Sequence, residues 1–202
     1  MARGSRRYGH LRRRLNELRR HLLAFLPPPP QSKISFTPQE LDLTRSFVVL
    51  AHAEIEAFCE DLALAKARTS QQAFASRGQV TPVLRRIVSY YVAKKGMSWS
   101  GVLTPSPKTV EQALNSYLQA VRDNNGIKRK NLERLLYPLG VLEPMLDTTW
   151  LAQMDSFGTK RGGLAHQTIG AVSPPDPVSE SANVSQLLTG LLDLDRALSR
   201  IQ

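Results

Sequence analysis

The segment Arg161-Gly-Gly-Leu-Ala-His166 carries the two residue types that are needed to cut a phosphodiester bond of RNA. Cleavage without a metal ion requires a group that titrates near neutral pH to take the proton of a ribose 2′-hydroxyl, and a cation to hold the charge that grows on the phosphoryl oxygens. A histidine side chain suits the first task and an arginine side chain the second. His166 is therefore the candidate base and acid, and Arg161 the candidate phosphate clamp.

Three residues beside this pair could assist substrate binding. If a helix begins at Gly162 or Gly163, its free amides would point toward the same anion, and the absent side chains would let a phosphate approach closely. Arg161 would then lie just before the helix, because five positions correspond to about 140° around a helix and would put the pair on different faces. Lys160 could add a long-range phosphate contact. This chemistry needs no metal and no organic cofactor.

An arginine followed by a histidine is in itself a weak signal in this chain. Similar spacings occur at Arg3 and His10, at Arg14 and His21, and at Arg45 and His52. The pair of Arg161 and His166 differs from them because it lies between two predicted helices, late in the chain, within a run of small residues.

The elements that would position the pair are all predicted helices. Thr37-Pro38-Gln39-Glu40 has the order of a capping box and predicts a helix from 38 to about 68. The same order of capping residue and proline opens helices at 82–95 and 107–123. Further helices are expected at 128–138, 147–157 and 178–201, the fifth ending at Gly158. No segment alternates with period two, so we predict an all-α fold, an up-and-down helical bundle over residues 38–202.

Residues 1–26 form a basic helical arm ahead of this bundle. They hold eight arginines against the single acid Glu17, a net charge of +7, whereas the other 176 residues carry only +3 of the total +10. Leucines recur at threes and fours in this segment and form one stripe. The proline-rich linker 27–37 then ends the helix. The arm is expected either to bind phosphate or a partner, or to pack its leucines on the body or on a second copy.

Composition excludes several classes of protein. The single cysteine, Cys59, has no partner for a disulfide or a cysteine-rich zinc site and is expected to be a buried structural thiol. No apolar run is long enough to span a membrane, and no signal peptide is evident. We therefore expect a cytoplasmic protein.

Two segments of the chain resemble the HEPN superfamily, in particular its RiboL-PSP-HEPN group. The string Arg161-Gly-Gly-Leu-Ala-His166 is similar to the HEPN signature of arginine, four residues and histidine. The segment from Val48 to Leu62 resembles the first core helix of the group, in which a glutamate precedes a small residue and an aromatic, and Glu56 fills that place. The resemblance spans about residues 38–201 and leaves out the arm.

This resemblance implies a metal-independent endoribonuclease, a toxin or a defence effector, with RNA as substrate. HEPN domains that cut RNA generally dimerise so that two motifs line one cleft, which implies a homodimer in which both copies of Arg161 and His166 face each other. Glu56 would support the site from its helix, and a neutralising partner protein is a further expectation. Apart from this resemblance, His52 lies at the border of an apolar stripe (Ala51, Ile55, Phe58 and Leu62) and Glu56 lies on its polar side, so the two are expected to form a hydrogen-bonded pair on the helix surface.

Two departures from the family pattern leave an alternative open. Gly162 follows the arginine where active members often have asparagine, aspartate or histidine, and it can place no polar group. Thr168 stands where one HEPN branch has a tyrosine that is modified during neutralisation. The alternative is a catalytically inactive HEPN module that binds RNA or a protein partner, or a purely structural helical adaptor.

Overall fold

The computed structural model describes residues 4–27, 33, 35–94, 105–166 and 174–201, with the backbone alone at Glu143, Ala165 and His166. This part of the chain consists of helices and contains no strand. Seven are α-helices and two are short 3₁₀-helices: α1 (Arg6–Leu22), α2 (Pro38–Arg77), α3 (Pro82–Lys94), α4 (Pro107–Arg122), α5 (Arg129–Leu136), η1 (Tyr137–Leu139), η2 (Glu143–Met145), α6 (Thr148–His166) and α7 (Pro177–Arg200). The prediction of an all-α fold is confirmed.

Helix α2 begins where its capping box predicts and continues past its predicted end. The Thr37 side chain accepts from the Glu40 amide, and the Glu40 carboxylate accepts from the Thr37 amide. The helix runs to Arg77 rather than to about residue 68 and ends at Gly78, whose φ of +63° gives the left-handed C-cap for which glycine is suited. The added turns bury Ser70 and Ala73 although they show no apolar stripe.

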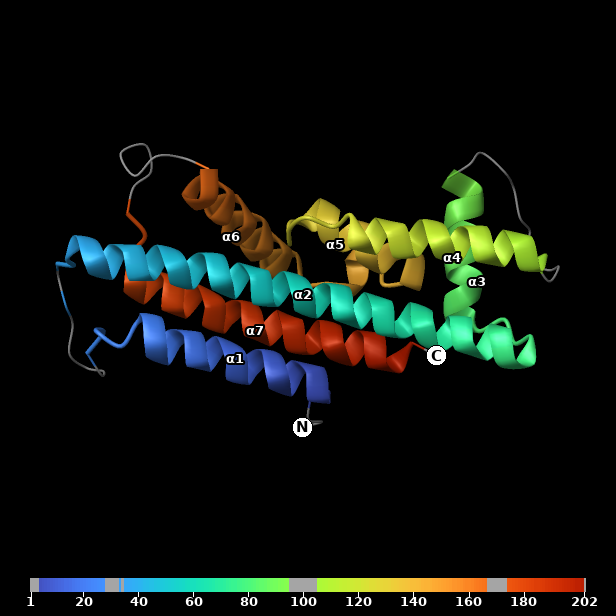
Figure 1. Ribbon diagram of the computed structural model, residues 1–202, viewed down its shortest axis with the longest axis horizontal. Helices are drawn as coiled ribbons and strands as arrows, with labels where there is room; N and C mark the ends of the chain where they lie inside the picture. Colours follow the sequence, from blue (N-terminus) through green and yellow to red (C-terminus); the bar gives the residue numbers. More distant parts are fainter. Residues whose placement is uncertain (1–3, 28–32, 34, 95–104, 167–173, 202) are drawn as a thin grey trace.

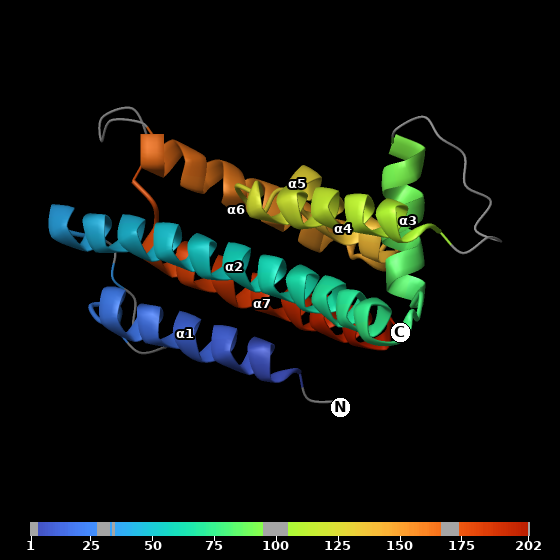
Figure 2. The same cartoon turned by 45° about the vertical axis from the view of Figure 1, so that its right-hand side comes forward.

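Helix α2 is the central element of the bundle (Figures 1 and 2). Helices α1, α3, α4, α5, α6 and α7 all pack against it. Helices α1 and α7 lie along one side of α2, with α1 antiparallel to it, whereas α6 lies along the other side and α3 crosses its end steeply. A helix surrounded in this way buries residues on more than one face.

Helix α1, the basic arm, is docked on the bundle. The leucine stripe is buried against α2 and α7, at Leu11, Leu15 and Leu18. The Tyr8 hydroxyl donates to the Leu188 carbonyl at 3.2 Å, and the Arg19 guanidinium donates to the Ser181 carbonyl at 3.1 Å. Of the two expected arrangements, the structure has the one in which the leucines pack on the body.

Helix α6 does not end at Gly158 as predicted but continues to His166. Gly158 is buried, and an added Cβ there would lie 2.9 Å from Cγ of Lys128. The glycine thus allows the start of α5 to approach α6 closely and does not stop the helix. This extension places the whole segment from Arg161 to His166 inside a helix.

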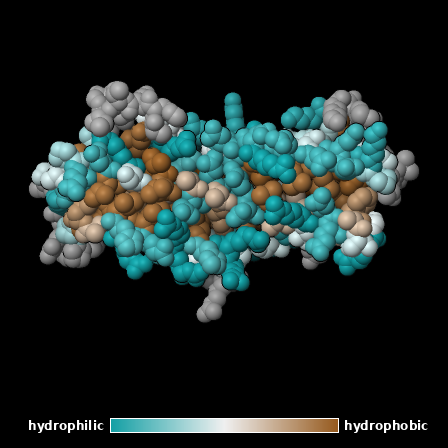
Figure 3. Space-filling view, in the orientation of Figure 1, coloured by the Kyte–Doolittle hydropathy of each residue, from teal (hydrophilic) through white to brown (hydrophobic). Residues whose placement is uncertain are grey.

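Polar side chains cover most of the face seen in Figure 3, with apolar side chains gathered along α2. In the described part of the chain, no helix is both long enough and apolar enough to cross a membrane.

Candidate functional site

Arg161 lies in the last turns of α6, half-buried, on a helix that packs against α2. The expectation that a helix begins at Gly162 or Gly163 is wrong, because α6 is continuous through both residues. Within the helix their amide groups donate to carbonyl groups of the preceding turn. The C-terminal end of a helix also carries partial negative charge. A phosphate at this position would therefore have to be held by side chains rather than by free backbone amides.

Gly162 borders open space. A Cβ built on this residue would meet no atom within 4 Å. The backbone of α6 is therefore open at Gly162, on the side of a helix and not at its start.

His52 lies beneath this part of α6. Its side chain is only 1% exposed, and its ring stacks on Phe157 with 6.3 Å between centroids and 23° between planes. The prediction that His52, at the border of the apolar stripe, forms a pair on the helix surface is wrong, because α6 packs on this part of α2 and covers the ring. Nδ1 of His52 lies 3.7 Å from Oε2 of Glu56, so the predicted hydrogen bond between them is not formed.

Glu56 is fixed by the loop between α4 and α5. Its Oε1 accepts a hydrogen bond from the amide of Gly126, whose φ of +131° is a conformation that other residues rarely adopt. In the same loop Asn124 donates to Oε1 of Glu60 at 2.9 Å and to the Gly126 carbonyl at 3.0 Å. The loop therefore holds the carboxylate of Glu56 in place and leaves its Oε2 facing His52.

The charges of this cluster are coupled. Burial, and to a smaller extent the charge of Arg161, lowers the pKa of the His52 imidazole to about 4, so the ring is neutral at pH 7. Burial raises the pKa of the Glu56 carboxyl group, against the lowering effect of the Gly126 hydrogen bond and of Arg161. Among the described residues no carboxylate forms an ion pair with Arg161, so its positive charge is not neutralised by a direct partner.

Lys160 has a different environment from Arg161. Its ammonium group donates to Oε1 of Glu180 on α7 at 2.5 Å, and the Glu180 side chain is almost completely buried. The ion pair joins α6 to α7 and occupies the group that the sequence suggested for a phosphate contact.

His166 is the last residue of α6, and its side chain lies outside the described residues, as does Thr168. On a helix His166 is about 140° from Arg161. The two side chains of one chain therefore start from different faces of α6.

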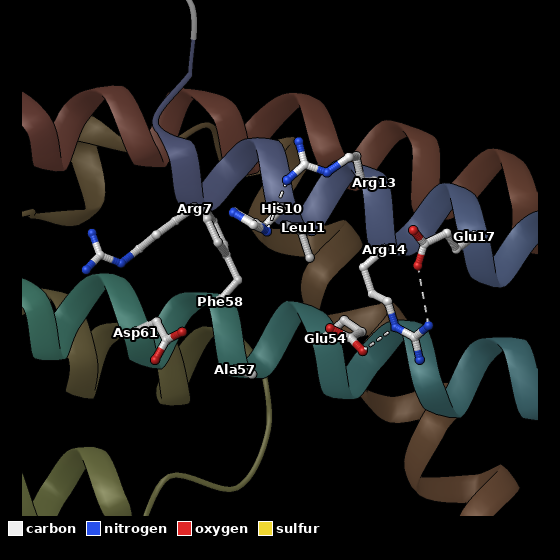
Figure 4. A pocket seen from close by; sticks show the side chains of 10 residues that line it. All are labelled: Arg7, His10, Leu11, Arg13, Arg14, Glu17, Glu54, Ala57, Phe58 and Asp61. Atoms are coloured by element: carbon white, nitrogen blue, oxygen red, sulfur yellow. Dashed lines mark hydrogen bonds and ion pairs between the residues drawn. The ribbon is translucent and has the colours of Figure 1, made fainter.

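A groove with a volume of about 540 Å³ lies elsewhere, between α1 and α2 (Figure 4). In it Arg14 pairs with Glu54 at 3.0 Å, and His10 bonds to Arg13 at 3.1 Å. Its lining carries three arginines and three acids, namely Arg7, Arg13, Arg14, Glu17, Glu54 and Asp61. The opposite charges leave no marked preference for an anion.

Neither a metal nor a reactive thiol is indicated. Among the described residues no group of three His, Cys, Asp or Glu is placed to hold a metal ion. Cys59 is buried, as predicted, and burial raises the pKa of its thiol to about 12.

Arg161 and Glu56 were candidate site residues from the sequence, whereas Phe157, Gly126 and His52, which lie around them, were not. Phe157 and Gly126 carried no chemical signal, and His52 was placed on the surface. The spacing of four between His52 and Glu56 was the one available signal, since it puts both side chains on one side of α2.

Comparison with known proteins assigns the chain to a family. The family model described as RiboL-PSP-HEPN matches residues 10–181, which includes most of α1 as well as α6. The sequence resemblance had been limited to residues 38–201, so the family extends further toward the N-terminus than expected. No curated protein and no solved structure matches the chain.

Proposed function

Because the chain belongs to the RiboL-PSP-HEPN family, we propose that it is an endoribonuclease that cuts RNA without a metal ion and uses Arg161 and His166. The observation that carries the proposal is the state of Arg161: it is half-buried at the end of α6, beside open space at Gly162, and forms no ion pair with a described residue. A guanidinium in this setting is a strong ligand for a phosphodiester.

The reaction would be an internal transesterification. The neutral imidazole of His166 takes the proton of the ribose 2′-hydroxyl, the 2′-oxygen forms a bond to phosphorus, and the bond from phosphorus to the 5′-oxygen breaks. Arg161 holds the negative charge on the phosphoryl oxygens. The leaving 5′-oxygen takes a proton from a second acid, and the products end in a 2′,3′-cyclic phosphate and a 5′-hydroxyl.

The need for a second acid supports a homodimer as part of the proposal. A single chain offers one imidazole in this motif, whereas a two-fold pair would bring two imidazoles and two guanidinium groups to one cleft. The angle of about 140° between Arg161 and His166 on α6 fits this arrangement, since each side chain could face a different part of the shared cleft.

The test is an RNA cleavage assay with excess chelator, using structured and unstructured RNA. Wild type is expected to cut, and His166→Ala and Arg161→Ala are expected to lose cutting by at least a hundredfold. Arg77→Ala and His21→Ala are matched controls, because Arg77 is exposed in the last turn of α2 and His21 is exposed on α1. Cutting that survives both motif substitutions, or that carries 3′-phosphate ends formed without a cyclic intermediate, would contradict the proposal.

The second candidate is a module that binds RNA without cutting it, and the docked basic helix favours it. Arg6, Arg13 and Arg20 follow one another at intervals of seven and are exposed. They lie on the face of α1 opposite the buried leucine stripe, so α1 presents a row of cations to the solvent. Salt-sensitive RNA binding by wild type with no cutting by any version would support this candidate. Salt-insensitive or absent binding would favour a structural adaptor.

A further inference from the structure

Three buried polar atoms without a hydrogen-bond partner among the described residues belong to two neighbouring side chains. They are Nδ1 and Nε2 of His52 and Nε of Arg161. A buried polar atom that lacks a partner costs about 1–3 kcal/mol, so native proteins rarely keep three together. Because His52 and Arg161 interact electrostatically, each is a candidate for the partner that the other lacks.

Glu56 provides the partner on one side of the ring. Its Oε1 is occupied by the Gly126 amide, and its Oε2 lies 3.7 Å from Nδ1 of His52. A shift of less than 1 Å would bring this pair within hydrogen-bond distance. The Nδ1 atom is therefore the one that faces a fixed acceptor.

Arg161 provides the partner on the other side. The His52 ring stacks on Phe157, which precedes Arg161 by one turn of α6. Helical side chains lean toward the N-terminus of their helix, so the stem of Arg161 runs back over the turn that holds Phe157. The charge of Arg161 also contributes to the lowered pKa of the His52 imidazole, which places the guanidinium group near this ring.

We infer that His52 is a positioning residue that links Glu56 to Arg161: its Nδ1–H donates to Oε2 of Glu56, and its Nε2 accepts the Nε–H of Arg161. The inference rests on the proposed function, in which Arg161 holds the phosphate. The link satisfies all three unpartnered atoms. Of the five N–H donors of the guanidinium it uses the one on Nε, and the other four remain for the phosphoryl oxygens.

A neutral ring between the carboxylate and the guanidinium has a chemical advantage over a direct ion pair. Glu56 bonded to Arg161 would cancel the charge that the phosphate needs, whereas an imidazole spacer orients the guanidinium and leaves its charge intact. The carboxylate in turn fixes which nitrogen of the ring carries the proton, because only a donor can face it. The low pKa of His52 is consistent with this role.

Nuclear magnetic resonance of ¹⁵N-labelled full-length protein without RNA tests the link directly. We expect the His52 ring to carry its proton on Nδ1 and to remain neutral down to about pH 5. The Nε–H of Arg161 should exchange slowly with water and couple to Nε2 of His52. A proton on Nε2, titration near pH 6.5, or rapid exchange of the Arg161 Nε–H would overturn the inference, whether or not the protein cuts RNA.

Variants of His52 add a readout that a merely structural role would not move. His52→Phe keeps a ring on Phe157 without nitrogens, and His52→Gln restores an acceptor near the position of Nε2. We expect kcat to fall about 10- to 100-fold in His52→Phe, as for other misplaced catalytic groups, and to recover in part in His52→Gln. Equal kcat values in the two variants would contradict the link. If His52→Phe fails to fold, the nuclear magnetic resonance spectrum of the wild-type protein and the kcat of His52→Gln test the link without it. Absence of cutting by wild type would contradict the proposed function and leave the link between Glu56, His52 and Arg161 to the nuclear magnetic resonance test.

Discussion

The ring of His52 on α2 stacks on the ring of Phe157 on α6, and this contact joins the central helix to the helix that carries the candidate motif. The His52 ring is buried, and its Nδ1 lies 3.7 Å from Oε2 of Glu56. Phe157 precedes Arg161 by one helical turn of α6. The titration of His52 is therefore coupled both to the stability of the fold and to the order of the site.

The stability of the protein should fall as the pH decreases from about 6.5 to 4. In the unfolded chain His52 takes up a proton near pH 6.5, whereas in the folded protein its pKa is about 4, so acid favours the unfolded state in this window. The loss from this residue is about 2 kcal/mol between pH 7 and pH 5. Glu56 opposes it, since a raised pKa adds stability as the pH falls.

Urea unfolding of wild type and His52→Phe at both pH values measures this effect. The variant lacks the titrating group but keeps the stacked ring and Glu56, so the difference between the two pH dependences isolates His52. Parallel pH dependences would show that the imidazole is already protonated or exposed in the folded state.

The ion pair of Lys160 with Glu180 should be structural. Lys160→Met would leave the carboxylate of Glu180 buried without its cation and should lower the free energy of unfolding by about 2 kcal/mol or more. The double variant Lys160→Met with Glu180→Gln should regain most of this loss, because no unpaired charge remains. A Lys160→Met variant of normal stability with a raised KM for RNA would instead assign the lysine to the substrate.

Much of the helical fold could be predicted because capping residues mark helix starts locally. The starts at Pro38, Pro82 and Pro107 match, since a polar cap and a first-turn proline act within one turn of chain. The end of α6 could not be predicted, because a glycine that admits a neighbour, as Gly158 does, looks in sequence like a glycine that ends a helix.

The prediction that His52 lies on the helix surface was wrong for a related reason. A single apolar stripe was used to divide α2 into a buried and a polar side, but α2 is packed by α1 and α7 on one side and by α6 on another. A residue at the border of the stripe, such as His52, is then covered by a second neighbour. Only the tertiary arrangement of helices decides its environment.

The substitution Gly162→Ala should affect the stability of α6 and the cleavage of RNA in opposite directions. The new Cβ meets no atom within 4 Å, and alanine favours a helix over glycine by about 1 kcal/mol, so the free energy of unfolding should rise by up to that amount. If a phosphate approaches the backbone here, the same methyl group should lower kcat/KM for RNA cleavage.

Gly190→Ala is the matched control, because its Cβ would lie 2.2 Å from Cδ1 of Trp150 and should destabilise the protein. Thermal unfolding and RNA cleavage are measured on both variants. A Gly162→Ala protein that is stabilised and fully active would remove the close approach from the proposed site.

A shared cleft between two copies predicts complementation between inactive chains. A heterodimer of Arg161→Ala with His166→Ala keeps one guanidinium and one imidazole, supplied by different subunits. Its activity should exceed that of either homodimer, yet stay below wild type by about a hundredfold or more, because one of two acid–base groups is lost. Co-expression with two affinity tags and tandem purification would give the heterodimer.

The matched control pairs a wild-type chain with a chain that carries both substitutions, so that the remaining arginine and histidine come from one subunit. If each cleft draws on both subunits symmetrically, the two heterodimers should differ only modestly in rate. Activity in the control alone would show that each chain holds a complete site, and a monomer by light scattering would exclude the shared cleft. Because both heterodimers contain the same number of each side chain, the comparison depends on where the groups meet and not on how many remain.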